Sequence, residues 1–275
     1  MTTDDAAQLA QLAGLDTGRA HNARVYDYLL GGKDNFAADR QAAERALQAA
    51  PNIQVSMRAN RRFMERATRY VAQELGIRQF LDIGTGIPTS PNLHEVAQEV
   101  DPQARVVYVD NDPIVVAHAR ARLASTPQGR TSVLNADLTD PTTILTSPEV
   151  TTSLDLTRPV GLSIITVLQF VHDDDQARAV VRTLTDALPS GSTLVLGVIT
   201  NDGSPEQGRA GAAAYRASGI PTRHRNHEET LGLIPAGFVL EEPGVVLVHR
   251  WRPASEDRQI QDDQVFVYGA VAVKV

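Results

Sequence analysis

The chain has 275 residues, of which 42% are hydrophobic, and carries a formal net charge of −7 at pH 7. This length is enough to bury a full core, and an acidic chain with only small basic clusters lacks the dense basic face that nucleic-acid binding usually needs. The absence of cysteine excludes disulfides, thiolate metal sites and a cysteine nucleophile.

The beginning of the chain, MTTDDAAQLAQLAGLD, does not resemble a targeting segment. It is acidic early and has neither the basic start nor the long apolar core of a signal peptide. No apolar stretch reaches the roughly 18 residues of a membrane span. We therefore expect a cytoplasmic protein without a membrane partner.

Residues 1–78 are expected to form a helical extension. A first helix ends at Gly31-Gly32, and a second is expected over residues 37–50. The apolar spacing from about Asn60 predicts a third helix, with Gly76 in the position of a C-terminal glycine.

Residues 79–275 alternate between short apolar runs and helical patterns. The runs are β-branched or apolar along their length, as in a parallel sheet covered on both faces. Helices between them are expected to begin at Ser90-Pro91 and, with Asp112 as N-cap, at Pro113. The alternation predicts a doubly wound, Rossmann-like α/β domain, with strands at 80–83, 106–109, 132–134, 161–167 and 193–199.

The end of the chain follows a different pattern. The apolar runs 245–248 and 266–273 are separated by a polar segment without a clear helical period. We expect these two runs to form an antiparallel pair of strands at the end of the sheet.

The stretch QFLDIGTGIPTSPNL, residues 79–93, places an acid and two spaced glycines directly after a strand. Gly84 and Gly86 therefore lie at the edge where open parallel sheets bind ligands. Without Cβ atoms they allow a ligand to approach the backbone closely. The dinucleotide fingerprint G-x-G-x-x-G would need a glycine at Thr89, so the loop departs from that pattern.

Acids at three successive strand ends favour one class of ligand. Asp110 can accept hydrogen bonds from both hydroxyls of a ribose, and Asp137 from an adenine amino group while Leu138 packs on the ring. The charge of Asp82, two residues before Gly84, disfavours a pyrophosphate. It favours a ligand that carries an ammonium and a sulfonium, and S-adenosylmethionine is such a ligand.

Plainer interpretations exist for each of these residues. A D-x-G-x-G occurs in many strand–turn–helix joints, and acids such as Asp110 and Asp137 often cap helices or lie in solvated turns. Their succession after three strands favours the cofactor site. A nicotinamide-dependent oxidoreductase is a further alternative. The charge of Asp82 and the presence of Thr89 instead of a glycine both disfavour it.

At these residues the chain resembles a class I S-adenosylmethionine-dependent methyltransferase, through LDIGTG, YVDNDP and NADL. It resembles more closely a bacterial S-adenosyl methyltransferase family formerly described as a domain of unknown function. The matching blocks are ARVYDYLLGGKDNFAADR, FLDIGTGIPT, VVYVDNDPIVVAHARA and HRWRP. The resemblance implies a seven-stranded methyltransferase sheet whose last strand is antiparallel. It also implies S-adenosylmethionine as cofactor and S-adenosylhomocysteine as product.

The resemblance also assigns roles to single residues. It implies that the methionine part lies by Asp82, Gly84 and Gly86, the ribose by Asp110 with Asn111 near the adenine, and the adenine edge by Asp137 and Leu138. The segment 24–35 is expected to fold over this edge as a lid that adds Tyr28 and Lys33, with Tyr26, Asn35 and Phe36, to the cofactor site. The alternative is that these aromatic residues belong to the core and that Lys33 is solvated.

After the fourth strand, TVLQFVHDDD resembles the V-L-H-H-L-P-D stretch of many small-molecule methyltransferases. Gln169 takes the place of its first histidine and His172 that of its proline, which makes both catalytic candidates. His172 has an equally good interpretation as a polar residue before the helix that starts at Asp173. A general base adds rate only where the acceptor must lose a proton early; His224 and His227 are weaker candidates for it.

We expect no metal site. His224-x-x-His227 has no third ligand at a useful spacing, and acids in the first turn of a helix explain Asp173-Asp174-Asp175. The sequence thus predicts a methyltransferase that acts on a small-molecule acceptor, with residues 201–226 and the N-terminal helices on the acceptor side. The alternative is a catalytically silent protein that binds the cofactor as a sensor or partner. Neither the acceptor nor the oligomeric state can be inferred.

Overall fold

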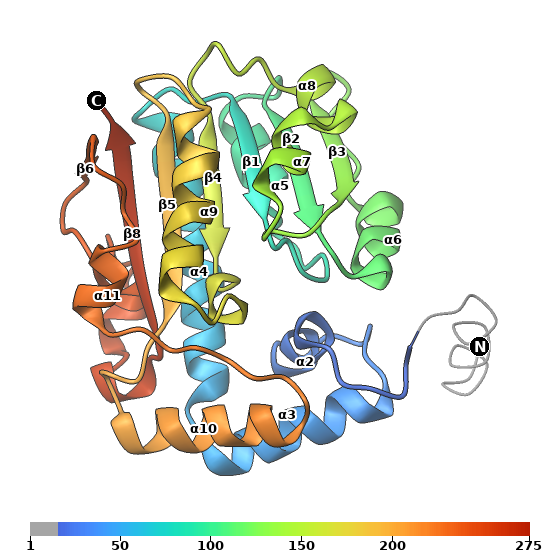
Figure 1. Ribbon diagram of the computed structural model, residues 1–275, viewed down its shortest axis with the longest axis vertical. Helices are drawn as coiled ribbons and strands as arrows, with labels where there is room; N and C mark the ends of the chain where they lie inside the picture. The colour runs from blue at the N-terminus through green and yellow to red at the C-terminus, as the bar shows by residue number, and fades with distance from the viewer. Residues whose placement is uncertain (1–15) are drawn as a thin grey trace.

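The strands form one mixed sheet in the computed structural model, which describes residues 16–275 (Figure 1). The expectation that the N-terminus is not a signal peptide falls on residues outside this range, apart from Asp16. Within the described range, no helix combines the length and the apolar composition needed to cross a membrane.

Five parallel strands form most of the sheet, in the order β3-β2-β1-β4-β5, and β8 lies antiparallel beside β5. The strand order and the antiparallel last strand agree with the expected methyltransferase fold. The strands are β1 Gln79–Ile83, β2 Arg105–Asp110, β3 Arg130–Asn135, β4 Gly161–Ile165, β5 Thr193–Ile199, β6 Phe238–Leu240, β7 Val246–Leu247 and β8 Val267–Lys274.

Over residues 16–275 the sheet has eight strands, so the expected count of seven is wrong. β6 and β7 both pair with β8, at Lys274–Ala272 and at Gly269–Tyr268, so together they occupy one edge position. A turn divides them, in which the Gly244 N–H donates to the carbonyl of Glu241 at 2.9 Å. Pro243 lies in this turn and has no N–H to donate to a ladder.

The helices differ from the expected ones mainly at their beginnings. They are α2 Asn22–Leu29, α3 Ala37–Ala49, α4 Ile53–Gln73, α5 Leu93–Val100, α6 Pro113–Arg122, α7 Pro141–Thr146, α8 Pro148–Ser153, α9 Asp174–Asp186, α10 Pro205–Ala217 and α11 His227–Leu231. α4 begins before Asn60 because Ile53 and Met57 are buried against neighbouring helices. α5 begins after Pro91 because Asn92 is its N-cap. The predicted cap of α6 is confirmed, since Asp112 Oδ1 accepts from the Ile114 N–H at 2.8 Å.

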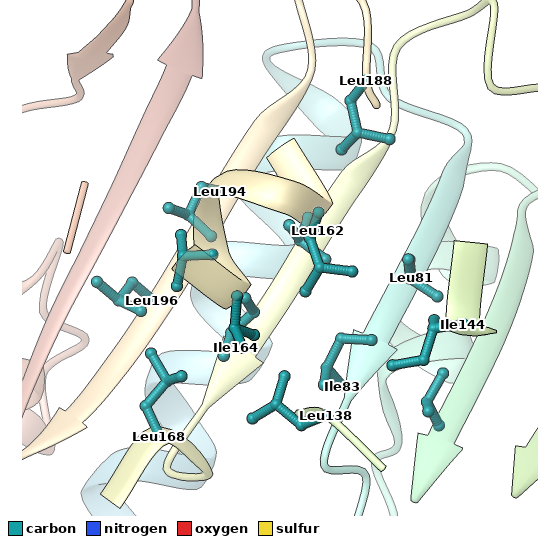
Figure 2. Packing of buried hydrophobic residues seen from close by; sticks show 14 of the residues in the cluster. Leu81, Ile83, Leu138, Ile144, Leu162, Ile164, Leu168, Leu188, Leu194 and Leu196 are labelled. Atoms are coloured by element: carbon teal, nitrogen blue, oxygen red, sulfur yellow. The ribbon is translucent and has the colours of Figure 1, made fainter. Parts of the chain in front are cut away.

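Each face of the sheet is covered by its own helices. Residues such as Leu81, Leu162 and Leu194 pack with α7, α8 and α9 on one face (Figure 2). Phe80 and Val106 point to the opposite face, toward α4, α5 and α6. Each fully buried side chain of this size stabilises the fold by roughly 1.5–3 kcal/mol, so alternation along the strands holds both helical layers in place.

A third group of helices lies beyond the carboxyl ends of the parallel strands (Figure 1). α2, α3 and α10 share a separate apolar cluster that contains Val25, Ala46 and Ile220. The first turns of α4 belong to this cluster, and its later turns, from Ala59 to Ala72, pack on the sheet. One helix therefore joins the N-terminal helices to the core of the sheet domain.

Candidate active site

A cavity of about 820 Å³ lies between the carboxyl ends of the strands and the helices beyond them. Its volume is near the top of the roughly 300–1,000 Å³ range of small-molecule sites. The glycine loop and Asp110 line it from the sheet, Tyr26 from α2, Met57 from α4 and Tyr215 from α10. Residues from the N-terminal helices and from the segment after β5 thus face the predicted cofactor loop.

The two glycines of the loop are required for different reasons. Gly84 has φ +76°, and a Cβ at this position would lie 2.6 Å from Cβ of Val167 in the loop after β4. Gly86 has φ +69°, but a Cβ there would meet no atom within 4 Å. Both backbone conformations favour glycine. Gly84 allows the glycine loop to pack on the loop after β4. Gly86 leaves space in the cavity next to its own backbone.

Asp110 is held in place by two backbone donors. Its Oδ2 accepts from the Gly86 N–H and its Oδ1 from the Asp112 N–H, both at 2.9 Å. Burial raises the pKa of the Asp110 carboxyl, although these two hydrogen bonds act in the opposite direction. Each oxygen retains a lone pair, so the carboxylate can still accept hydrogen bonds from a pair of neighbouring hydroxyls.

Asp82, at the carboxyl end of β1, provides a second carboxylate in the cavity. Burial raises its pKa to about 6, and the nearby charge of Asp110 adds to this, while Ser163, Arg61 and Thr85 oppose it. A partly buried carboxylate near a second one is stabilised when a cation binds beside it. The site is therefore suited to a positively charged ligand group.

The beginning of α5 offers little to a phosphate. Arg61 donates to the carbonyls of Thr89 and Pro91, at 2.6 and 2.8 Å. The Asn92 N–H donates to the carboxylate of Glu95 in the first turn. Sites for pyrophosphate rely on free N–H groups and positive charge at a helix N-terminus. Here a carboxylate already occupies that position, so a ligand without phosphate fits better.

Asn111, Asp137 and Leu138 all line the cavity. Asn111 Nδ2 donates to Asp137 Oδ2 at 2.9 Å, and Asp137 Oδ1 accepts from both the N–H and the hydroxyl of Thr139. Partial burial acts to raise the pKa of Asp137, but these hydrogen bonds hold it below its usual value. Leu138 is buried against the core, so the structure brings the three expected residues together.

Tyr28 and Lys33 are not brought to the cavity. Tyr28 Oη donates to the carboxylate of the exposed Glu44 at 3.3 Å, and Lys33 is exposed beyond the end of α2. Because side chains two residues apart on a helix face different directions, Tyr26 lines the cavity and Tyr28 does not. Tyr26 Oη donates to the carbonyl of Met57 at 3.3 Å.

The segment before α2 closes the cavity beside Asp110. His21 lines it, and its Nδ1 lies 2.9 Å from Asp112 Oδ2. Arg24 is buried, with Nε 3.1 Å from Asp39 Oδ2 and Nη1 3.9 Å from Asp112 Oδ2. His21 was not predicted, because it lies in a short irregular segment without periodicity.

The two predicted catalytic residues both line the cavity. Gln169 is 4% exposed, and its Nε2 donates to the carbonyl of Thr166 at 2.5 Å. His172 is exposed, with Nε2 3.2 Å from the carbonyl of Pro221. Thr166 has φ +50°, a strained conformation of the kind found at functional sites.

A third histidine lies in the cavity wall, in the segment after α10. His224 Nδ1 is 2.6 Å from Asn201 Oδ1, and its Nε2 is 3.0 Å from the hydroxyl of Thr222. Burial, and then the charge of Arg223, lower its pKa to about 4. His227 does not line the cavity; its ring packs against Tyr268. In the described part of the chain, no three metal-ligand side chains are grouped to hold an ion.

Comparison with known proteins agrees with this geometry. The model of a family described as S-adenosyl methyltransferase matches residues 8–275. No curated protein was found to match the chain.

Two solved structures are similar over nearly the whole chain. A DUF574 family protein from Streptomyces avermitilis is 50% identical, with 94% of this chain and 99% of that chain covered and a TM-score of 0.92. A putative methyltransferase from Thermobifida fusca is 39% identical, with 95% and 97% covered and a TM-score of 0.86.

Magnesium protoporphyrin IX methyltransferase from Synechocystis, with bound S-adenosylhomocysteine, is 12% identical over 91% of this chain and 93% of that chain. Its TM-score of 0.55 shows a shared fold.

Proposed function

The chain belongs to the S-adenosyl methyltransferase family, with S-adenosylmethionine as its cofactor, and from this premise we propose that its cavity also binds a small-molecule methyl acceptor. When bound, the cofactor supplies a methyl group that its sulfonium already activates for transfer. The residues of the cavity then have to hold and align two reactants, and alignment is what accelerates such a displacement most.

The cofactor is proposed to lie along the glycine loop. Asp82 would hold the ammonium, Gly84 and Gly86 would let the methionine part approach the backbone, and Asp110 would accept from the ribose hydroxyls. Asn111, Asp137 and Leu138 would surround the adenine. The main support for this assignment is the hydrogen bond from the Gly86 N–H to Asp110. This bond places the glycine loop next to a carboxylate that keeps two free lone pairs.

The acceptor is proposed to bind between the glycine loop and α10. Met57, Phe170, Tyr215 and Ile220 line this part with apolar and aromatic surface. Such a wall suits a small molecule with an apolar body. Gln169 and His172 line the same cavity and are proposed to position the acceptor.

The residues before the sheet are proposed to act as a lid. The division of the chain into a helical extension, residues 1–78, and a sheet domain stays a prediction of the sequence. Among the described residues, α2 and the residues before it line the cavity beside Asp110. Tyr28 and Lys33 are left out of the proposed cofactor site because neither lines the cavity: Tyr28 contacts Glu44, and Lys33 is exposed. A cytoplasmic location and the lack of a nucleic-acid partner stay predictions of the sequence.

Calorimetric titration of the purified chain with S-adenosylmethionine, S-adenosylhomocysteine and NAD tests the assignment. We expect saturable binding of both adenosyl ligands and none of NAD. A screen of small-molecule acceptors, followed as release of S-adenosylhomocysteine, then tests the acceptor. Tight binding without turnover on any acceptor would favour the silent binding protein, which no feature of the structure supports specifically.

A further inference from the structure

Asn201, Thr222 and His224 form a chain of hydrogen-bonded side chains that the cofactor assignment does not use. Asn201 follows β5, and the other two lie in the segment after α10. The imidazole bridges its neighbours, with Nδ1 2.6 Å from Asn201 Oδ1 and Nε2 3.0 Å from Thr222 Oγ1. Thr222 and His224 both line the cavity.

The order of these contacts gives each hydrogen bond a direction. The carboxamide oxygen of Asn201 can only accept, so the imidazole proton lies on Nδ1. Nε2 then carries a lone pair and accepts from the Thr222 hydroxyl. The Thr222 oxygen keeps its own lone pairs free for a donor in the cavity. Burial lowers the pKa of His224 to about 4, so the ring is neutral near pH 7.

The segment that carries Thr222 and His224 has a separate anchor. The buried Arg225 provides it, because it donates to the carbonyls of Leu168 and Val171 at 2.9 and 2.8 Å. Its Nε is also 3.0 Å from Asp174 Oδ1. The polar groups of Thr222 and His224 line the cavity in addition to this anchor.

The segment that holds Thr222 and His224 lies on the side of the cavity where the acceptor is proposed to bind. Gly84 packs on Val167, and two residues further along the carbonyl of Gln169 accepts from the Arg223 N–H at 2.8 Å. Thr222 and His224 flank Arg223. A short series of contacts thus connects the glycine loop to this pair, while the apolar Ile220 lies just before it.

We propose that Thr222 and His224, oriented by Asn201, take up the proton of a hydroxyl or amine acceptor during methyl transfer. This inference rests on the proposed function. As the methyl–sulfur bond breaks and the bond to the acceptor atom forms, the acceptor proton passes to Thr222 Oγ1 and the proton of Thr222 passes to His224 Nε2. Sulfur leaves uncharged, and the positive charge ends on the imidazolium, which releases its proton to solvent. His224 is the proton acceptor and Asn201 its positioning residue.

Nitrogen NMR of the full chain, with ¹⁵N-labelled histidines and saturating S-adenosylhomocysteine, tests the relay. We expect His224 to carry its proton on Nδ1. Phenol, used as the probe, is expected to shift the Nε2 resonance because its O–H reaches Thr222. Anisole has the same ring without the O–H and is expected to leave the resonance unchanged. Assignment comes from His224→Gln, which removes the signal.

Two variants separate the relay from simple structural support. Thr222→Val is expected to abolish the response to phenol while S-adenosylhomocysteine still binds, and Thr222→Ser is expected to keep the response. A proton on Nε2, equal responses to phenol and anisole, or no response to phenol would each overturn the relay. The tautomer can also be read in the free protein. Failure to bind S-adenosylhomocysteine therefore counts against the proposed function and leaves the relay to be decided by the tautomer.

Discussion

The Gly86 N–H donates a hydrogen bond of 2.9 Å to Oδ2 of Asp110, which lies 24 residues further along the chain. The bond joins the loop after β1 to the end of β2. These two strands are neighbours in the sheet. The geometry of the glycine loop and the position of the ribose carboxylate therefore depend on each other.

Asp110→Ala is expected to weaken S-adenosylhomocysteine binding by roughly 100-fold or more. Two hydrogen bonds from ligand hydroxyls to a carboxylate contribute about 1.5–3 kcal/mol each, and about 1.4 kcal/mol corresponds to a factor of ten. Calorimetry measures the change. Asp137→Ala, at the rim, is the matched control and should cost less. An unchanged dissociation constant for Asp110→Ala would show that the ribose lies elsewhere.

Asp82 is expected to make the stability depend on pH. Its pKa of about 6 in the folded chain lies above the ordinary 3.8, so its contribution to stability is complete below pH 3.8 and is lost as the pH rises through 6. Asp82→Asn should therefore be more stable than the unmodified chain at pH 8, by about 3 kcal/mol. The two should be alike near pH 4. Urea denaturation at both pH values measures the difference.

The same carboxyl is expected to govern the affinity for S-adenosylmethionine. A cation binds the ionised form better, so affinity should rise with pH up to about pH 6 and level off above it. Asp82→Asn should bind more weakly and lose this pH dependence. If calorimetry gives the same pH profile for both proteins, Asp82 does not contact the ligand's positive charge.

Alanine at the two loop glycines is expected to act differently. Gly84→Ala adds a clash with Val167 to an unfavourable φ, and should cost about 2–5 kcal/mol of unfolding free energy. Gly86→Ala meets no atom within 4 Å, so it should cost only about 1–2 kcal/mol but weaken ligand binding. Urea melts combined with calorimetry separate the two effects. Equal destabilisation would contradict the packing argument.

The lid is expected to depend on Asp39. This buried carboxylate accepts from the N–H groups of His21 and Phe36, at 2.9 and 2.8 Å, and pairs with Arg24. Asp39→Ala removes the nearer of the two carboxylates beside the buried Arg24 and leaves Asp112, at 3.9 Å. Breaking such a buried pair costs about 3–5 kcal/mol. Hydrogen exchange should become faster over residues 16–36. Glu44→Ala removes only an exposed partner and should leave the exchange unchanged.

His172 is expected to have a modest role. Its exposed imidazole can offer one hydrogen bond of about 1 kcal/mol. Once the acceptor screen identifies a substrate, His172→Ala should raise its KM by about fivefold with little change in kcat. Gln169→Ala disturbs the contact with Thr166 and should lower kcat more. If His172→Ala has the same kinetics as the unmodified enzyme, His172 has no part in the reaction.

The sequence by itself was enough to place the features that depend on neighbouring residues. β1, β2 and β5 lie where apolar runs predict them, Asp112 caps α6, and Gly76 has the positive φ of a helix C-terminal glycine. Asp82 lies at the carboxyl end of β1, and Gly84 and Gly86 follow this strand directly, so the chain order alone brings them to the ligand-binding edge. In these cases the physical cause acts over one or two turns of chain.

Tertiary structure alone decided which residues from distant segments meet at that edge. Tyr26 rather than Tyr28 lines the cavity because α2 packs in one orientation on α3 and α4. Lys33 is exposed, and His21 lies beside Asp112 although no periodicity indicated it. Thr222 and His224 meet Asn201 in a segment that Arg225 anchors to the loop after β4. Such contacts depend on how whole elements pack, and local sequence patterns do not carry that information.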